Sequence, residues 1–212
     1  MAFVIAVDGP AASGKGTIAG RLAAHYGYPA LDTGLLYRAV GYRLLIDGAE
    51  LSDAAAAEAV ARNLDPSELE RPEVRTRTAG EAASQVAVHP GVRAALLDFQ
   101  RSFAAQEPGS VLDGRDIGTV IAPAAPAKLF VTASPEVRAE RRWKQLTGQG
   151  ELVAFEDILA DIRIRDERDS GRASAPLVQA ADAVLLDTSQ MTIEAAFDAA
   201  RRIVEAARAP KA

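Results

Sequence analysis

Residues Phe3 to Thr17 read FVIAVDGPAASGKGT, which predicts a buried strand, a tight loop and the start of a helix. Gly9 and Gly14 allow backbone angles that other residues resist, so successive N–H groups can turn inward around an anion at a helix N-terminus. Lys15 would reach the outer phosphates of a nucleotide, and the Thr17 hydroxyl would face Mg²⁺. The stretch is therefore predicted to be a phosphate-binding loop.

In this loop Gly16 separates the lysine from the threonine, whereas the strict pattern places Ser or Thr directly after the lysine. The Gly-Lys-Gly-Thr form resembles nucleoside monophosphate kinases rather than GTPases. An ordinary strand–turn–helix junction with incidental glycines is the alternative reading. The residues predicted to bind ATP are Gly9, Pro10, Ala11, Ala12, Ser13, Gly14, Lys15, Gly16 and Thr17.

Composition limits the class of protein. With 212 residues, of which 49% are hydrophobic and 25% charged, the chain is long enough for one sizeable core, and we expect a single domain that acts as a monomer. No apolar run reaches the length of a membrane span and no cleavable leader is visible, so we expect a cytoplasmic protein that does not bind membranes.

Charge and residue content exclude several kinds of site. The chain has no cysteine, which removes thiol nucleophiles and thiolate metal sites, and His25 and His89 are too few for a histidine-rich metal centre. A net charge of −5 argues against non-specific binding to nucleic acid. An anionic ligand must therefore be bound by locally clustered arginines.

The order of elements predicts an α/β P-loop fold with a central parallel sheet flanked by helices on both faces. Continuously apolar runs, typical of strands covered on both sides, alternate with longer helical segments. The strands are predicted at Phe3–Asp8, Ser110–Asp113, Lys128–Thr132 and Ala183–Asp187, and the helices at Lys15–Tyr26, Pro135–Thr147 and Ile193–Ala207.

Two segments depart from this alternation. The chain is mostly helical between Tyr37 and Pro108, and we interpret residues of about 38–107 as an inserted lobe over the carboxyl edge of the sheet. The resemblance of the phosphate loop to nucleoside monophosphate kinases implies that this lobe binds a mononucleotide. Thr147 to Glu151 contains glycines suited to a mobile connection, which predicts a short lid at about residues 142–157.

A short buried strand ends in Asp113-Gly114-Arg115-Asp116, at the edge of the sheet where α/β proteins bind ligands. Asp113 would assist Mg²⁺ through water, and Arg115 would hold a phosphate. A polar turn without function is the alternative.

Further arginines lie in helical segments. Arg165, Arg168, Asp169 and Arg172 are spaced to share one helix face, and Arg138, Arg141 and Arg142 repeat the pattern on the preceding helix. Two such faces could close over a polyphosphate, since the guanidinium fork binds phosphate oxygens in pairs. A solvated surface of ion pairs is the alternative. Asp32 and Thr33 form a predicted N-cap pair, with Arg38 one turn into the next helix.

Taken together, these motifs closely resemble the bacterial cytidylate kinases over nearly the whole chain. The resemblance rests on Gly9–Thr17, Leu31–Gly34 with Tyr37-Arg38, Ala83–Ala87, Asp113–Val120, and Arg165–Asp169 with Arg172 and Ala175–Leu177. It implies that the γ-phosphoryl group of ATP is transferred to CMP or dCMP, with Mg²⁺, giving ADP and the diphosphate. No dedicated general base is needed, because the acceptor is an ionised phosphate.

The resemblance also implies roles for single residues. Ser84, Arg93 and Asp116 would contact cytosine, Arg38, Arg115 and Arg172 the acceptor phosphate, and Arg165 and Asp169 the sugar. Lys15, Arg115, Arg142 and Arg168 would serve catalysis. The full set predicted to bind CMP is Thr33, Tyr37, Arg38, Ser84, Arg93, Asp113, Arg115, Asp116, Arg165, Asp169 and Arg172. One departure from the family is that Asn63 to Thr78 is short and poor in β-branched residues, where the family's lobe usually carries a small sheet.

Two other functions fit the phosphate loop. A kinase for a small acceptor that is not a nucleotide would share the loop without needing residues that read a base. A binding or switch module would use the loop to sense ATP or GTP without phosphorylating a metabolite. The absence of an Asn-Lys-x-Asp guanine signature and the excess of arginine favour two phosphorylated ligands over the switch.

Overall fold

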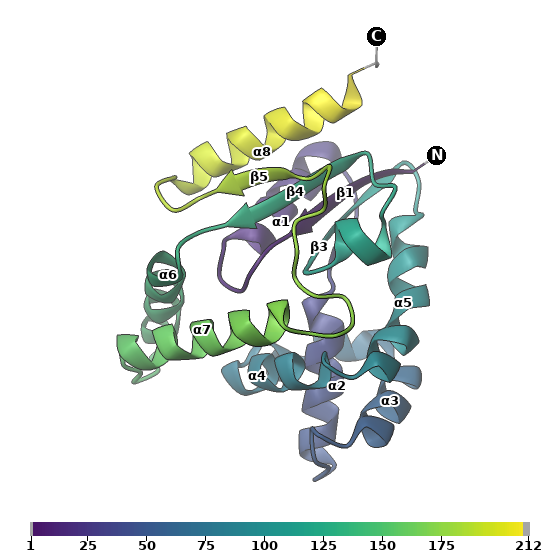
Figure 1. Cartoon of the computed structure of the whole chain (residues 1–212), viewed down its shortest axis with the longest axis vertical. Coiled ribbons are helices and arrows are strands. Elements are labelled where there is room, and N and C mark those ends of the chain that lie inside the picture. Colours follow the sequence, from purple (N-terminus) through teal and green to yellow (C-terminus); the bar gives the residue numbers. More distant parts are fainter. Residues whose placement is uncertain (1, 210–212) are drawn as a thin grey trace. The chain divides into compact units, whose positions relative to one another are not determined.

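A five-stranded sheet with the order β2-β3-β1-β4-β5 organises the protein, whose computed structural model describes residues 2–209 (Figure 1). The strands are β1 (Phe3–Asp8), β2 (Ala30–Asp32), β3 (Gly109–Gly114), β4 (Ala127–Thr132) and β5 (Val184–Asp187). β1 pairs in parallel with both β3 and β4, and β4 pairs in parallel with β5. The predicted α/β fold with a parallel sheet is confirmed; β2, which is only three residues long, was not predicted.

The centre of the sheet is β1, the strand at which the strand order reverses. Its register pairs Asp8 with Gly114, so the carboxyl ends of β1 and β3 finish side by side. In open α/β sheets ligands bind at the carboxyl edge where the order reverses. The loops that follow Asp8 and Gly114 are therefore the natural place for a ligand site.

Four long helices accompany the sheet: α1 (Lys15–Tyr26), α6 (Pro135–Gly148), α7 (Phe155–Ser170) and α8 (Ile193–Arg208). The main core joins Ile18 and Leu22 of α1 and Val204 of α8 to apolar strand residues such as Val7 and Leu129. Figure 1 shows α8 lying along β5. A short π-helical turn, η3 (Ile117–Ile121), follows β3.

The described chain divides into two compact units. The first comprises the residues up to Leu31 and those from Ala104 onward, and the second is Asp32–Phe103. The predicted lobe of about residues 38–107 falls largely within the second unit, and its role in binding a mononucleotide stays a prediction. No helix among residues 2–209 is both long and apolar enough to cross a lipid bilayer.

Helices form most of the second unit. They are α2 (Gly34–Ile46), α3 (Ala54–Arg62), the 3₁₀ turns η1 (Pro66–Glu70) and η2 (Pro72–Arg75), α4 (Arg77–Val86) and α5 (Pro90–Ala104). α2 and α4 pack closely at Gly41, where a Cβ atom would lie 2.7 Å from the Cβ atom of Ala82. A proline begins each 3₁₀ turn, and residues 63–78 contain no strand.

Candidate functional site

The loop between β1 and α1 has the backbone of an anion-binding loop. Gly9 and Gly14 have φ angles of 153° and 89°, and a Cβ atom on Gly9 would collide with the carbonyl oxygen of Val131. Gly14 is the N-cap of α1, and no side chain caps the helix. The positive end of the α1 dipole, without a capping side chain, therefore faces this loop and favours an anion there.

Ala12 in the same loop also has a positive φ, 59°, which is unfavourable for a residue with a side chain. Its methyl group packs against an apolar cluster between α6 and α7 that includes Ala139 and Ile162. Ser13 is fully buried, and its Oγ atom makes no hydrogen bond within residues 2–209. The shape of the loop is held by the surrounding protein.

Lys15 and Asp113 lie at the start of α1 and the end of β3. The Lys15 Nζ atom lies 3.9 Å from the Asp113 Oδ2 atom, and both side chains are largely buried. The same carboxylate oxygen lies 3.7 Å from the point where a Cβ atom on Gly16 would stand, next to Thr17. The Lys15 ammonium group, the Asp113 carboxylate and Thr17, which carries a hydroxyl group, therefore lie close together at the first turn of α1.

A cavity of about 430 Å³ adjoins this loop on the side of α6 and α8. It is lined by Ala12, Ser13, Gly14, Thr17, Ile18, Arg141, Arg142, Gln145, Thr188, Met191, Thr192, Ile193 and Ala196. Arg141 donates to the backbone oxygen of Ser13 at 3.3 Å and to the backbone oxygen of Thr188 at 2.7 Å. The mixture of apolar wall and few polar groups is typical of a nucleotide or cofactor pocket.

Arg138 is buried, and its role differs from the anion clamp that we predicted. Its guanidinium group donates to both carboxylate oxygens of Asp166 on α7, at 3.0 and 2.6 Å, and to the backbone oxygen of Ala11 at 3.3 Å. Its Nε atom donates to the backbone oxygen of Ala133. All of these partners belong to the protein, so Arg138 links the phosphate loop to α7.

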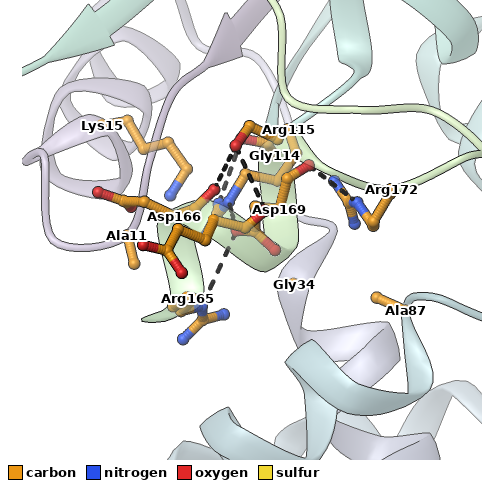
Figure 2. Close-up of polar contacts among 12 residues, drawn as sticks. Ala11, Lys15, Gly34, Ala87, Gly114, Arg115, Arg165, Asp166, Asp169 and Arg172 are labelled. Carbon is orange, nitrogen blue, oxygen red and sulfur yellow. Dashed lines mark hydrogen bonds and ion pairs between the residues drawn. The ribbon is translucent and has the colours of Figure 1, made fainter. Parts of the chain in front are cut away.

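Arg115, directly after β3, forms the centre of a second cluster (Figure 2). Its Nε atom donates to the Asp169 Oδ2 atom at 2.8 Å, and its Nη1 atom donates to the Gly114 oxygen at 3.3 Å. Arg165 lies one helical turn before Asp169, with 3.9 Å between its Nε atom and Oδ2. Burial of Asp169 acts to raise its pKa, but the positive charges of Arg115, Arg165 and Arg172 outweigh burial and the pKa is lowered.

Arg172 joins this cluster from outside the helix, which corrects our expectation that it shares a helix face with Arg165. α7 ends at Ser170, and Arg172 is buried with its Nε atom donating to the backbone oxygen of Asp169 at 3.2 Å. α7 is therefore two residues shorter than the spacing of these charges predicted. Three arginines nevertheless converge on one carboxylate, and their number suits a polyanionic ligand.

Asp116 and Asp8 flank the same loop. Asp116 is buried and is the N-cap of η3, although its side chain makes no cap hydrogen bond. Asp8 is also buried and accepts hydrogen bonds from the backbone N–H groups of Ile117 and Gly118, each at 2.8 Å. Burial raises the pKa of Asp8 to about 6, against the opposing effect of these two N–H groups.

The remaining acceptor candidates belong to the second unit. Arg38 donates to the backbone oxygens of Val74 and Thr76, at 3.2 and 2.9 Å. The guanidinium group of Arg93 lies over the ring of Tyr37 at 5.4 Å and reaches the Ala87 oxygen at 3.5 Å. Arg38 thus joins α2 to η2 and to the start of α4, and Arg93 joins α5 to α2.

Two details concern helix ends in this unit. The predicted N-cap pair is half right: Asp32 accepts the N–H of Gly34 at 2.9 Å, but Thr33 is buried and makes no cap hydrogen bond. Ser84 is buried on α4, and Pro90 begins the next helix, α5.

The predicted lid region contains the end of α6 and the start of α7, with a loop of residues 149–154 between them. Trp143 donates to the backbone oxygen of Val153 at 3.0 Å and ties the loop back to α6. Arg142 donates to Gln145 at 2.8 Å, and both line the cavity described above. Arg168 lies half-buried on α7. The mobility of this region stays a prediction.

Sequence reasoning missed three residues that shape the site: Asp8, Asp166 as the partner of Arg138, and Thr188. Asp8 ends an apolar run, directly before Gly9. Its place as a charged residue at the end of a buried strand was the one signal that could have identified it as a site residue, because a buried carboxylate needs hydrogen-bond partners.

Comparison with known proteins gives a consistent result. The family model described as cytidylate kinase matches residues 5–206. A cytidylate kinase of Caulobacter vibrioides is 78% identical over 209 residues, which cover 99% of this chain and 98% of that relative. A cytidylate kinase of Xanthobacter autotrophicus is 68% identical over 207 residues, covering 98% and 99%. A crystal structure of an uncharacterized protein from Eubacterium ventriosum has a TM-score of 0.58 at 16% identity, covering 96% and 98%, which is a likeness of fold alone.

Proposed function

The chain belongs to the cytidylate kinase family, and on that premise we propose how its residues transfer the γ-phosphoryl group of ATP to CMP or dCMP. Membership makes it an ATP-dependent nucleoside monophosphate kinase. The products are ADP and CDP or dCDP. The observation that carries the proposal is the convergence of three arginines on Asp169 beside a phosphate loop, because two phosphorylated ligands need more positive charge than one.

For the donor, we propose that the loop from Gly9 to Thr17 holds the phosphates of ATP. The N-terminus of α1 and the ammonium group of Lys15 would supply positive potential for the β- and γ-phosphates. The adjoining cavity, bounded by Arg141 and Thr188, has room for the nucleoside part. Arg142, which lines the same cavity, and Arg168 would stabilise the group in transfer.

For the acceptor, we propose a set of residues that contact CMP. Arg115 and Arg172 would bind the phosphate together with Arg38, and Arg165 and Asp169 would contact the sugar. The base would be read by Asp116 with Ser84 and Arg93: a carboxylate accepts from the 4-amino group of cytosine, and uracil presents a carbonyl at that position. Thr33, Tyr37 and Asp113 complete the proposed set.

The residues beside the first turn of α1 suit Mg²⁺. The Thr17 hydroxyl and the Asp113 carboxylate are hard oxygen donors, of the kind that Mg²⁺ prefers. Within residues 2–209 no three His, Cys, Asp or Glu side chains gather around a point as metal ligands. Mg²⁺ would therefore take its other ligands from phosphate and water, with Thr17 direct and Asp113 through water. When bound, it neutralises charge on the β- and γ-phosphates.

The reaction needs positioning rather than proton transfer. An ionised phosphate oxygen of CMP attacks the γ-phosphorus of ATP in line, the bond to the β,γ-bridging oxygen breaks, and ADP leaves with that electron pair. The acceptor oxygen carries no proton at neutral pH, so no side chain acts as a base. Lys15 and Arg115 would hold the two anions together and stabilise the charge of the transition state.

A coupled assay of ADP release tests the proposal. ATP with Mg²⁺ is offered with CMP, dCMP, UMP, AMP or GMP, and with no acceptor. We expect turnover with CMP and dCMP, weak turnover with UMP and little with the purine nucleotides. Equal rates with every acceptor would contradict base reading, and slow ATP hydrolysis that ignores the acceptor would favour the switch module.

Two wider features belong to the same proposal. The chain would act as a monomer, since all proposed ligands come from one chain, and sedimentation velocity tests this. The protein would reside in the cytoplasm, where its nucleotide substrates are, and cell fractionation tests that.

A further inference from the structure

Asp8 contacts the segment around Arg115 and Asp116 from two sides. In the β1–β3 register its backbone pairs with Gly114, the residue before Arg115. Its side chain binds the N–H groups of Ile117 and Gly118, the residues after Asp116, at 2.8 Å each. The dipeptide Arg115-Asp116 is thus held at both ends by one residue of β1.

The two hydrogen bonds engage both oxygens of the Asp8 carboxylate. Ile117 and Gly118 begin η3, and N–H groups at the start of a helical turn have no partner within the turn. One oxygen of Asp8 serves each N–H group. Gly118 permits the approach, since a Cβ atom there would lie 3.3 Å from the Asp8 Oδ2 atom and 3.1 Å from the Lys128 Cδ atom.

Few other charged side chains act on the Asp8 carboxylate. Lys128 of β4 passes close by, but its Nζ atom binds Asp182 and the backbone oxygen of Pro123. Asp116 repels the charge of Asp8, and Arg115 attracts it. Asp8 itself is 5% exposed, so water contributes little. Burying a carboxylate costs free energy unless hydrogen bonds replace its contacts with water. At the end of β1 those hydrogen bonds come from two backbone N–H groups beside Arg115 and Asp116.

We infer that Asp8 is a positioning residue for the acceptor: its carboxylate fixes the direction of Arg115 and Asp116 and so sets the affinity for CMP and the choice of base. The inference rests on the proposed roles of these two residues. Asp8 is also next to Gly9, but neither of its side-chain bonds goes to the phosphate loop. Loss of the carboxylate should therefore affect CMP far more than ATP.

The variant that tests this inference is Asp8→Asn. Asparagine has the shape of aspartate and can still accept one of the two hydrogen bonds with its side-chain oxygen. Its NH₂ group is a donor and would face the other backbone N–H group, which is also a donor. We expect the KM for CMP to rise about tenfold, from the loss of one charge-assisted hydrogen bond, and the preference for CMP over UMP to fall. The KM for ATP should stay within about twofold of the wild-type value, a split that general loss of structure would not produce.

Gly118→Ala provides a second route to the same effect, because the added methyl group pushes against the Asp8 oxygen from the other side. Asp53→Asn is the matched control. The Asp53 carboxylate also accepts two backbone N–H bonds, from Ala55 and Ala56 at 3.0 Å, but it caps α3. It should leave both KM values unchanged.

The outcomes separate the inference from the function. An unchanged KM for CMP in Asp8→Asn, while Arg115→Ala still raises it, overturns the inference and leaves the function intact. Equal changes in the KM for CMP and for ATP overturn it too. If the wild-type protein does not phosphorylate CMP, amide exchange of Ile117 and Gly118 by NMR still decides whether Asp8 holds the segment: faster exchange in Asp8→Asn supports it, and unchanged exchange refutes it.

Discussion

Lowering the pH should stabilise the wild-type protein relative to Asp8→Asn. The folded-state pKa of Asp8 is about 6, against 3.8 for an unperturbed carboxyl, so the folded protein binds this proton more tightly than the unfolded chain does. The stabilisation from that proton is fully present below pH 3.8 and is lost as the pH rises through about 6. Asparagine does not titrate, so the variant lacks this dependence.

The size of the effect follows from the two pKa values. The difference of about two pH units corresponds to a maximum of about 3 kcal/mol. Between pH 7.5 and pH 5 the wild-type free energy of unfolding should rise by about 1.4 kcal/mol relative to that of Asp8→Asn. This is less than the maximum because the stabilisation keeps growing until the pH falls below 3.8, where the unfolded chain is protonated as well. Taking the difference between the two proteins removes the titration of all other groups, which they share.

Urea unfolding at both pH values measures this difference. Trp143 is the one tryptophan of the chain, and it packs against the α6–α7 cluster in the same unit as Asp8. Its fluorescence therefore reports the unfolding of that unit. A difference between the proteins that is the same at pH 7.5 and pH 5, or that moves in favour of the variant at pH 5, would refute the reasoning about burial.

Other predictions concern the loop, its support, the base and the metal. Lys15→Ala should reduce kcat at least about a hundredfold with the circular dichroism spectrum unchanged, since a positive charge on the transferring group is lost; near-normal turnover contradicts the role. Arg138→Lys loses the paired hydrogen bonds to Asp166, so it should raise the KM for ATP about tenfold and lower the melting temperature. The control is Glu136→Gln, which breaks an exposed ion pair between the same two helices and should change neither value. Asp116→Ala should reduce the preference for CMP over UMP at least about tenfold in competition assays; an unchanged ratio counts against base reading. Chelation of Mg²⁺ should abolish turnover and leave the melting temperature unchanged, which calorimetry with and without EDTA checks.

The fold was largely predictable because its signals are local. Continuous apolar runs predicted four strands, and the longer helical segments predicted α1, α6 and α8 within one residue of their ends. β2 escaped prediction because it has three residues and only Leu31 is buried. Arg172 was placed on a helix because charge spacing continues past Ser170, while the backbone turns at Gly171.

The candidate site was predictable only in part, because its supporting contacts join residues far apart in the chain. Asp8 and Ile117 are separated by 109 positions, and Arg138 and Asp166 by 28. Spacing of arginines along a helix cannot distinguish Arg138, which binds protein groups, from Arg142 at the cavity. Burial makes that distinction, and burial of a single charged residue depends on packing that no local pattern encodes.

The positive φ angle of Ala12 has a consequence for nucleotide capture. An alanine in this conformation costs about 1 kcal/mol relative to glycine, and contacts with α6 and α7 hold it there. The conformational entropy of this segment is therefore lost during folding, before any ligand binds. In the proposed nucleotide site, an incoming triphosphate would meet a loop whose backbone is already ordered, so its dissociation constant would carry little penalty for loop closure.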